Sequence, residues 1–458
     1  MLVDSLRSAD PAFKSRVRIP ELYTRDVLKR AAHLARLDST DGPVPLRPQT
    51  PLKNNTKGRT VVDFAHFTDL ASRNIGGSVV ITNDEFFVEK ENLIKPEAPV
   101  SCKGQSGNRG GIYDGWETRR RRTAGHDWVV IRLGVPGVVH GVVVDTAFFR
   151  GNYPDRISVQ ACALDGYPAP EDLADAEWVD IVPETPCEGD SENAYPVHDR
   201  TRFTHVRLCI HPDGGVARLR VHGEAVRDPL DFSGLSWDLA ALDNGGRVIE
   251  QSDGFFNPAS NVITPGTART TKDGWETKRR RDDGHDWLTV CLAAPGHIHQ
   301  AIVDTSRYIG NAPDSCALLA CDASTDDLND PTAWWTLVAR QRLQPDQVHR
   351  FHTETQKQAT HVRLNIFPDG GLSRLRLLGY CSDSGALERG IRWINMLPEA
   401  QLRTLLSQLD ISAPQVEKFV GARPFTTLSD AEALLDQTTT AALRARLGIT
   451  HVDSDARG

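Results

Sequence analysis

The stretch Asp114-Gly-Trp-Glu-Thr-Arg-Arg-Arg-Arg122 returns 159 residues later as Asp273-Gly-Trp-Glu-Thr-Lys-Arg-Arg-Arg281. From these stretches onward, residues 114–162 and 273–321 are identical at 25 of 49 positions, which excludes a chance match. A repeat of this length indicates two copies of one structural unit. The chain of 458 residues therefore contains a duplicated domain rather than one large fold.

The match continues on both sides of this stretch. Thr204-His-Val-Arg-Leu208 returns as Thr360-His-Val-Arg-Leu364. Upstream, Gly76-Gly77 returns 169 residues later, so the first copy carries an insertion near residues 97–111, which is Gly-rich and predicts a loop. We predict four segments: an N-terminal helix and linker (1–62), a first repeat (63–228), a second repeat (229–382) and a helical appendage (383–458).

Within each copy the pattern is typical of short strands. Residues 128–133 form a β-branched run, Pro136-Gly137 predicts a turn, and residues 138–144 predict the next strand. Such strands with Gly/Pro turns favour a sandwich or jelly roll. After residue 383, leucines recur at helical spacing. We therefore predict an all-β fold, two tandem jelly-roll β-sandwich domains, with a small helical C-terminal appendage.

Charge and cysteine usage narrow the function classes. Lys plus Arg is 53 and Asp plus Glu is 61, a net charge of −8 that does not suit nucleic-acid binding. No apolar run approaches the roughly 18 residues of a membrane span, and the N-terminus lacks the apolar core of a secretory signal. The eight cysteines have no zinc-site spacing, so we expect reduced thiols in a reducing, cytoplasmic compartment.

The arginine runs are candidate anion-binding groups. Arginine binds a carboxylate through two parallel hydrogen bonds, whereas an extended run alternates faces and directs only half of its side chains into one site. The alternative is a solvated loop held by salt bridges. The candidate substrate-binding arginines are Arg119, Arg120, Arg121, Arg279 and Arg280.

Each copy also carries polar residues suited to acid–base chemistry. The imidazole of Gly-His-Asp-Trp is a candidate acid, base or metal ligand, or a His that only hydrogen-bonds a loop. The Asp that ends the following strand is a candidate base, or a carboxylate that accepts loop N–H groups. The catalytic candidates are Glu117, His126 and Asp145 with Glu276, His285 and Asp304, and the additional substrate-binding candidates are Asn152 and Asn311.

These motifs, together with Asp-Thr-x-x-x-x-Gly-Asn-x-Pro-Asp and Phe67-Thr-Asp-Leu-Ala-Ser-Arg-Asn-Ile-Gly-Gly77, resemble those of the allantoicase family over about residues 64–382. The resemblance implies two jelly rolls of the galactose-binding-like type and a homo-oligomer. It also implies an allantoate amidinohydrolase, a hydrolase of a non-peptide C–N bond that converts allantoate to ureidoglycolate and urea in purine breakdown. It supplies no settled catalytic residues.

The tail shows a second, shorter resemblance. Residues 394–398 and 422–425 are similar to the start of the ureidoimidazoline decarboxylases of the same pathway. This similarity covers only part of the tail, and the chain ends before the catalytic histidine region of that family. We therefore interpret the tail as a helical cap or interaction module rather than as a second enzyme.

The chemistry assigns a role to each residue type. Allantoate carries a carboxylate on a carbon with two ureido groups, and water must replace one of them. In our hypothesis, arginines of 119–122 or 279–281 hold the carboxylate, the Glu and Asp candidates handle water, and the His candidates protonate urea or hold a metal. We expect no certain cofactor, with a divalent metal left open. The alternative is a non-catalytic tandem jelly-roll protein that binds ligands with avidity.

Overall fold

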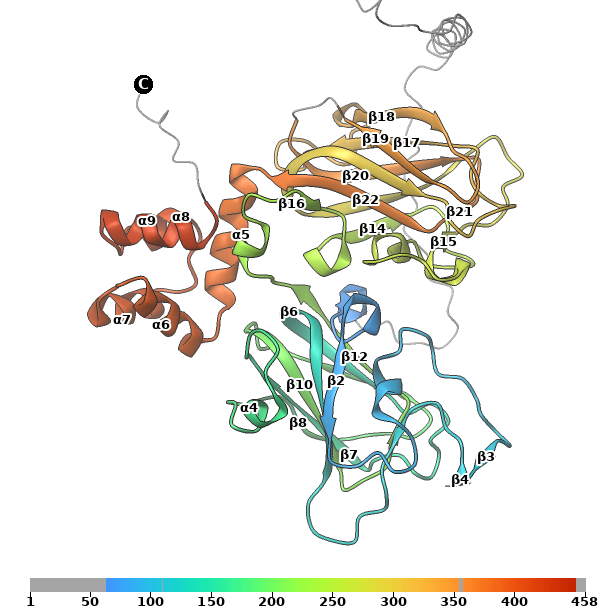
Figure 1. Ribbon diagram of the computed structural model, residues 1–458, viewed down its shortest axis with the longest axis vertical. Coiled ribbons are helices and arrows are strands. Elements are labelled where there is room, and N and C mark those ends of the chain that lie inside the picture. Colours follow the sequence, from blue (N-terminus) through green and yellow to red (C-terminus); the bar gives the residue numbers. More distant parts are fainter. Residues whose placement is uncertain (1–62, 109, 354–356, 450–458) are drawn as a thin grey trace, which may run out of the picture. The chain divides into compact units, whose positions relative to one another are not determined.

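The computed structural model describes residues 63–108, 110–353 and 357–449. The predicted N-terminal helix and linker lie outside the described residues. Figure 1 shows two β-sandwich repeats followed by a group of helices, as predicted. The strands of the first repeat are β1 (Thr68–Asp69), β2 (Ser78–Thr82), β3 (Ser106–Gly107), β4 (Gly110–Gly111), β5 (Trp116–Glu117), β6 (Asp127–Asp145), β7 (Arg156–Cys162), β8 (Val179–Pro186), β9 (Glu192–Pro196), β10 (Arg202–His211), β11 (Gly215–Val216) and β12 (Arg218–Ala225).

The second repeat follows the same order, apart from the short ribbon β3–β4 that the insertion adds to the first. Its strands are β13 (Trp237–Asp238), β14 (Arg247–Gln251), β15 (Trp275–Glu276), β16 (Asp286–Asp304), β17 (Ser315–Cys321), β18 (Trp335–Arg342), β19 (Val348–His352), β20 (Ala359–Phe367), β21 (Gly371–Leu372) and β22 (Arg374–Cys381). The short helices of the two repeats are η1 (Asp63–His66), η2 (Arg73–Ile75), η3 (Lys90–Ile94), α4 (Pro170–Ala174), η4 (Pro229–Phe232), η5 (Leu242–Asn244), η6 (Ala259–Ile263), η7 (Thr271–Asp273) and η8 (Pro331–Ala333).

The long strand β6 organises the first repeat. Its first part pairs with β2 and β10, and its second part pairs with β9 and β12. The prediction of a turn at Pro136-Gly137 is wrong, because one 19-residue strand runs through both residues. Pro136 lies where the strand changes partners, and its carbonyl accepts the N–H of Val226 at 2.8 Å. Proline is tolerated at such a change because no ladder N–H is required there.

The first and last strands of each repeat are neighbours. Thr68 of β1 pairs with Gly223 of β12, and Trp237 of β13 pairs with Gly379 of β22. The core of the first repeat contains buried residues from both parts of β6, such as Val129 and Val142, because the sheet folds over along this strand. Each repeat therefore closes on itself around its own core.

The tryptophan of the repeated motif belongs to this core. Trp116 and Trp275 are fully buried, and their indole N–H groups donate to the carbonyls of Asp84 and Asp253 at 2.8 and 2.7 Å. A buried indole needs such an acceptor. The Trp anchors the segment that follows it, so the next polar residues emerge at a defined place in each repeat.

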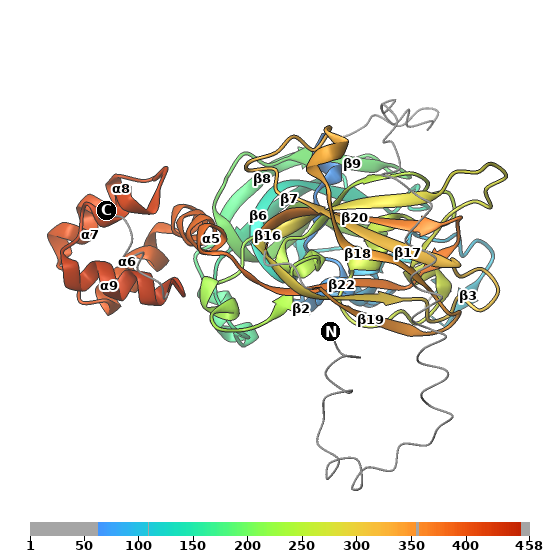
Figure 2. The same ribbon diagram turned by 90° about the horizontal axis from the view of Figure 1, so that it is seen from above.

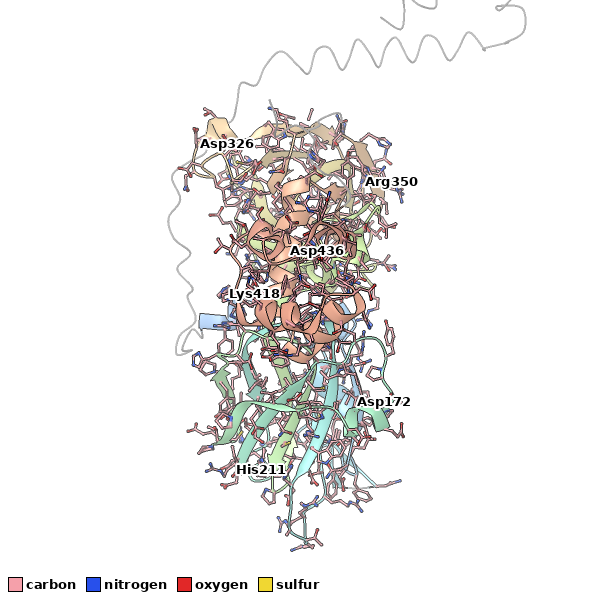
Figure 3. The ribbon with its side chains drawn as sticks, turned by 90° about the vertical axis from the view of Figure 1, so that its left-hand side faces the viewer. Asp172, His211, Asp326, Arg350, Lys418 and Asp436 are labelled. Carbon is pink, nitrogen blue, oxygen red and sulfur yellow. The ribbon has the colours of Figure 1, made fainter. Side chains whose placement is uncertain are left out.

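The tail is helical, as predicted, and its helices pack around a core that also contains Val138 and Val226 of the first repeat. Trp393, Leu402, Leu406, Phe419 and Leu443 are buried together. Figure 2 shows these helices, and Figure 3 labels Lys418 and Asp436 on them. None of the helices within the described residues is long and apolar enough to cross a membrane. The helices are α5 (Asp383–Met396), α6 (Glu399–Gln408), α7 (Ala413–Gly421), α8 (Leu428–Glu432) and α9 (Gln437–Arg446).

Candidate functional site

The cationic run after β5 divides into paired and unpaired side chains. Arg119 Nε lies 2.6 Å from Asp84 Oδ2, and Arg121 Nη1 lies 2.5 Å from Asp127 Oδ1. Arg120 and Arg122 are exposed and make no ion pair or hydrogen bond with any described residue. Arg119 and Arg121 therefore stabilise the loop, while the guanidinium groups of Arg120 and Arg122 are available to an external anion.

The second repeat divides its run in the same way. Lys278 takes the place of Arg119 and lies 3.6 Å from Asp253, and Arg280 Nη1 lies 2.8 Å from Asp286 Oδ1. Arg279 and Arg281 are exposed, again without an ion pair or hydrogen bond in the described part of the chain. Of the predicted anion-binding residues, the structure thus leaves Arg120 and Arg279 unpaired.

A glutamate–asparagine pair occurs at the same place in both repeats. Asn152 Nδ2 donates to Glu117 Oε1 at 2.7 Å, and Asn311 Nδ2 donates to Glu276 Oε1 at 2.7 Å. Burial raises the pKa of Glu117 above its ordinary value, and the bond from Asn152 opposes this rise only in part. A partly buried carboxylate with a raised pKa is typical of acid–base sites.

The aspartates at the strand ends hold the loops that follow them. Asp145 Oδ1 accepts the N–H of Ala147 at 2.8 Å, and Asp304 Oδ1 accepts the N–H of Ser306 at 2.7 Å. Thr146, which is fully buried, donates to the carbonyl of Glu188 at 2.6 Å. These contacts correspond to the loop-capping alternative for both aspartates.

The sequence motifs did not identify His211, which contacts His126. The two rings lie 4.6 Å apart, and His211 Nε2 lies 3.0 Å from Ser158 Oγ. Burial lowers the pKa of His211, and the charge of His126 acts in the same direction. Figure 3 labels His211, which is the last residue of β10 in the first repeat. Comparison of the two copies does not identify His211, because the corresponding residue of the second repeat is Phe367.

The second repeat surrounds its histidine differently. The ring of His285 lies 4.6 Å from the ring of Phe367, and its Nε2 lies 3.3 Å from Asn365 Oδ1. Burial lowers the pKa of His285, although the bond to Asn365 acts in the opposite direction. The two copies therefore share the glutamate–asparagine pair but differ around the imidazole.

The turn between β10 and β11 connects these groups in the first repeat. Two residues after His211, Asp213 Oδ2 accepts the backbone N–H of Arg121 at 2.7 Å. The backbone N–H of Gly214 donates to Thr118 Oγ1 at 3.2 Å. Gly214 has a φ of 143°, and a Cβ there would lie 2.7 Å from the nitrogen of Pro154, so only glycine fits. The Pro-Asp-Gly-Gly motif is thus a turn that positions the polar residues.

Contacts of Thr118 and Arg121 with the turn 212–215, and of Thr277 and Arg280 with the turn 368–371, join the loops that carry the polar residues of each repeat. We name the two resulting sets of residues the first rim (Glu117, Arg120, Arg122, His126, Asn152 and His211) and the second rim (Glu276, Arg279, Arg281, His285 and Asn311). Each rim combines a carboxylate, an amide donor, an imidazole and unpaired guanidinium groups. Within residues 63–449, apart from the gaps at 109 and 354–356, no group of three or more His, Cys, Asp or Glu side chains is arranged to hold a metal ion.

Comparison with known proteins agrees with the repeat structure. The model of the family "Allantoicase repeat" matches residues 68–226 and 237–382. A probable allantoicase of Nocardia farcinica is 50% identical over 319 residues, which cover 69% of this chain and 95% of the relative. A probable allantoicase of Streptomyces avermitilis is 45% identical over 343 residues, covering 72% and 90%. The crystal structure of allantoicase from Saccharomyces cerevisiae superposes with a TM-score of 0.60 at 34% identity, covering 68% of this chain and 93% of that one. The chain belongs to the allantoicase family.

Proposed function

We propose that the protein hydrolyses allantoate to ureidoglycolate and urea, with the chemistry at the rims. Membership of the family supports the reaction. The observation that supports the location is the glutamate–asparagine pair, which recurs at 2.7 Å in both repeats on the same strand position. The pair joins a partly buried carboxylate to an amide on a neighbouring loop, and this combination of burial, orientation and retention in both copies supports an acid–base role. Nothing observed favours the binding-module alternative.

Glu117 and Glu276 are the proposed bases that activate water. A base must be ionised near neutral pH and still attract a proton, so a carboxylate whose pKa is raised serves better than an exposed one. Glu117 meets this requirement through its burial. Asn152 keeps the carboxylate oriented through one oxygen and leaves the other for water. Asp145 and Asp304 take no part in this proposal beyond holding the adjacent loops.

The unpaired arginines of the rims are the proposed anchors for the substrate carboxylate. Arg120 and Arg122 in the first rim, and Arg279 and Arg281 in the second, have free guanidinium donors that match a carboxylate in geometry. Neighbouring Arg121 and Arg280 are tied to buried aspartates and fix the path of the run. Anchoring the carboxylate would place the carbon between the two ureido groups at the rim.

The imidazoles are the proposed acids for the leaving group. The departing nitrogen of urea needs a proton, and a histidine is suited to supply it near neutral pH. His126 has a second imidazole beside it at 4.6 Å, whereas His285 has Phe367 at the same separation.

We also propose that the protein works in the cytoplasm. All eight cysteines are free, and burial raises the pKa of Cys162 to about 12, as fits thiols that stay reduced in the cytoplasm. We also propose a homo-oligomer, as the family resemblance implies.

The test is urea release from allantoate by the purified full chain and by Glu117→Gln, Glu276→Gln and the double variant. We expect the double variant to lose roughly 10²- to 10⁴-fold in kcat/KM, the usual contribution of a general base. The matched control is Glu184→Gln, an exposed carboxylate of the first repeat that pairs with Arg156. Because the two rims differ around the histidine, Glu117→Gln and Glu276→Gln should lower kcat/KM by unequal factors. Turnover of the double variant within tenfold of the parent would overturn the assignment.

A further inference from the structure

A cavity of about 500 Å³ lies where the second repeat, the linker 229–236 and the helical appendage meet. It is separate from the rims, because none of its lining residues belongs to either of them. The family match ends at residue 382, and α5 begins at Asp383, so one wall is family sequence and the other is not. The polar and aromatic side chains that line it include Phe232, His297, Asp383 and Arg389.

The guanidinium of Arg389 in this cavity has no polar partner. It lies over the ring of Phe232 at 4.1 Å and over that of Trp237 at 5.0 Å, and it makes no hydrogen bond or ion pair with any described residue. Its five N–H donors are therefore unused. Burial lowers the pKa of Arg389, and the charges of Arg227 and Arg392 act in the same direction.

Two further ring nitrogens near Arg389 have no hydrogen-bond partner among the described residues. The Nδ1 of His297, which lines the cavity, is buried without a hydrogen-bond partner, and so is the Nε1 of Trp237 beneath the guanidinium. Buried polar groups without partners are rare and costly. The acidic lining residue, Asp383, is exposed at the start of α5 and makes no bond to Arg389. The cavity thus holds an unpaired guanidinium and an unpaired imidazole nitrogen.

We infer that this cavity is a second, non-catalytic binding site for a small carboxylate anion with a ureido or amide group. The two aromatic rings fix the plane of the Arg389 guanidinium, which suits bidentate contact with a carboxylate. His297, which lines the cavity, donates to a carbonyl oxygen when its Nδ1 carries the proton. The volume lies in the ordinary range of small-molecule sites, about 300–1,000 Å³. The ureido part of this assignment rests on the proposed function, whereas anion binding does not.

Binding here would couple the ligand to the appendage. The anion would contact Arg389 of α5 on one side and the second repeat on the other, and residues 447–449 line the same cavity. A ligand that touches both parts stabilises their docking by its differential affinity. The enzyme would then sense a ureido acid of the same chemistry as its substrate and product at a place where it does not react.

The test uses the full chain and N-carbamoylglycine, which combines a carboxylate with one ureido group. Hydrogen exchange should show protection of α5 and residues 447–449 on addition of the probe. Arg389→Lys keeps the charge but loses the bidentate fork, so the concentration for half-maximal protection should rise roughly tenfold or more. His297→Gln tests the second donor. The control Arg403→Gln removes a half-buried cation of the same appendage, which pairs with Glu399 and does not line the cavity, and should change nothing.

The outcomes separate this inference from the proposed function. Protection of α5 in the double variant Glu117→Gln/Glu276→Gln, which is expected to be inactive, would support a site independent of the rims. No protection of α5 at saturating probe, or equal protection in parent and Arg389→Lys, would overturn the site while leaving urea release untouched. Protection by inorganic phosphate but not by N-carbamoylglycine would overturn the carboxylate class. Arg389→Lys must match the parent in exchange without ligand, which shows that the appendage is intact.

Discussion

Replacing Arg218 by methionine should destabilise the first repeat by about 3–5 kcal/mol, the cost of removing one partner from a buried ion pair. The side chain is only 1% exposed, and its Nη2 lies 2.7 Å from Asp114 Oδ2. It also donates to the carbonyls of Glu97, Asp114 and Ala217 at 3.0, 3.1 and 2.7 Å. Methionine fills similar space but leaves the carboxylate and three carbonyls without these donors.

The pH dependence of this loss has a defined sign. Burial tends to raise the pKa of Asp114, but the bonds from Arg218 and from the N–H of Val100 outweigh it, so the pKa lies below the ordinary value of 3.8. A group with a lowered folded pKa contributes stability above the ordinary value, and that contribution is lost as the pH falls through the folded pKa. The difference between parent and variant should therefore be full at pH 7 and shrink below about pH 4.

The assay is hydrogen exchange on the full chain, read for β6 and β12 and compared with β16 and β22 of the second repeat. Only the first pair should lose protection in Arg218→Met. Adding Asp114→Asn should recover part of the loss, because it removes a largely buried carboxylate whose remaining cation, Lys95, lies 3.6 Å away. The matched variant Arg374→Met removes an arginine that bonds the carbonyls of Gly266, Asp273 and Ser373, so the added charge penalty should be absent. A loss under about 1 kcal/mol, or no recovery by Asp114→Asn, would refute the reasoning.

Three further outcomes are expected. Asn152→Ala removes a bond that lowers the pKa of Glu117, so the acid limb of the pH–rate profile should move to higher pH, and an unmoved limb would argue against Glu117 as the base. Thr146→Val removes the bond to Glu188 from a fully buried hydroxyl and should cost about 1–3 kcal/mol in urea unfolding. Arg446→Gln breaks the two-bond contact with Asp228, at 2.7 and 2.5 Å, and should speed amide exchange in α9 roughly tenfold. Unchanged exchange would show that this pair does not hold the appendage.

The repeat predicted the fold well because strand patterns and turn residues are local signals. Self-comparison identified two copies of one β-domain, and leucine spacing identified the helical tail. The turn at Pro136-Gly137 was mispredicted because these residues mark a change of pairing partners within one strand. That change depends on β9, β10 and β12, which come much later in the chain. No local window contains this information.

The sequence predicts which residue types form the candidate site, but it does not predict which of these side chains contact one another. The motif named Glu117 and Asn152, but their contact at 2.7 Å joins residues 35 positions apart and needs the fold. The sequence alone does not distinguish Arg119 and Arg121 from Arg120. The fold distinguishes them, because it brings Asp84 next to Arg119 and Asp127 next to Arg121. His211 lay outside every repeated motif, so comparison of the two copies could not find it.

The pairing of β1 with β12 has a consequence for synthesis on the ribosome. A repeat cannot close until its last strand has emerged, so the first repeat waits for residue 225 and then completes its sheet. At typical translation speeds the second repeat follows on the order of ten seconds later. Two halves this similar could exchange strands if both were unfolded together. The order of emergence keeps each strand with its own partners.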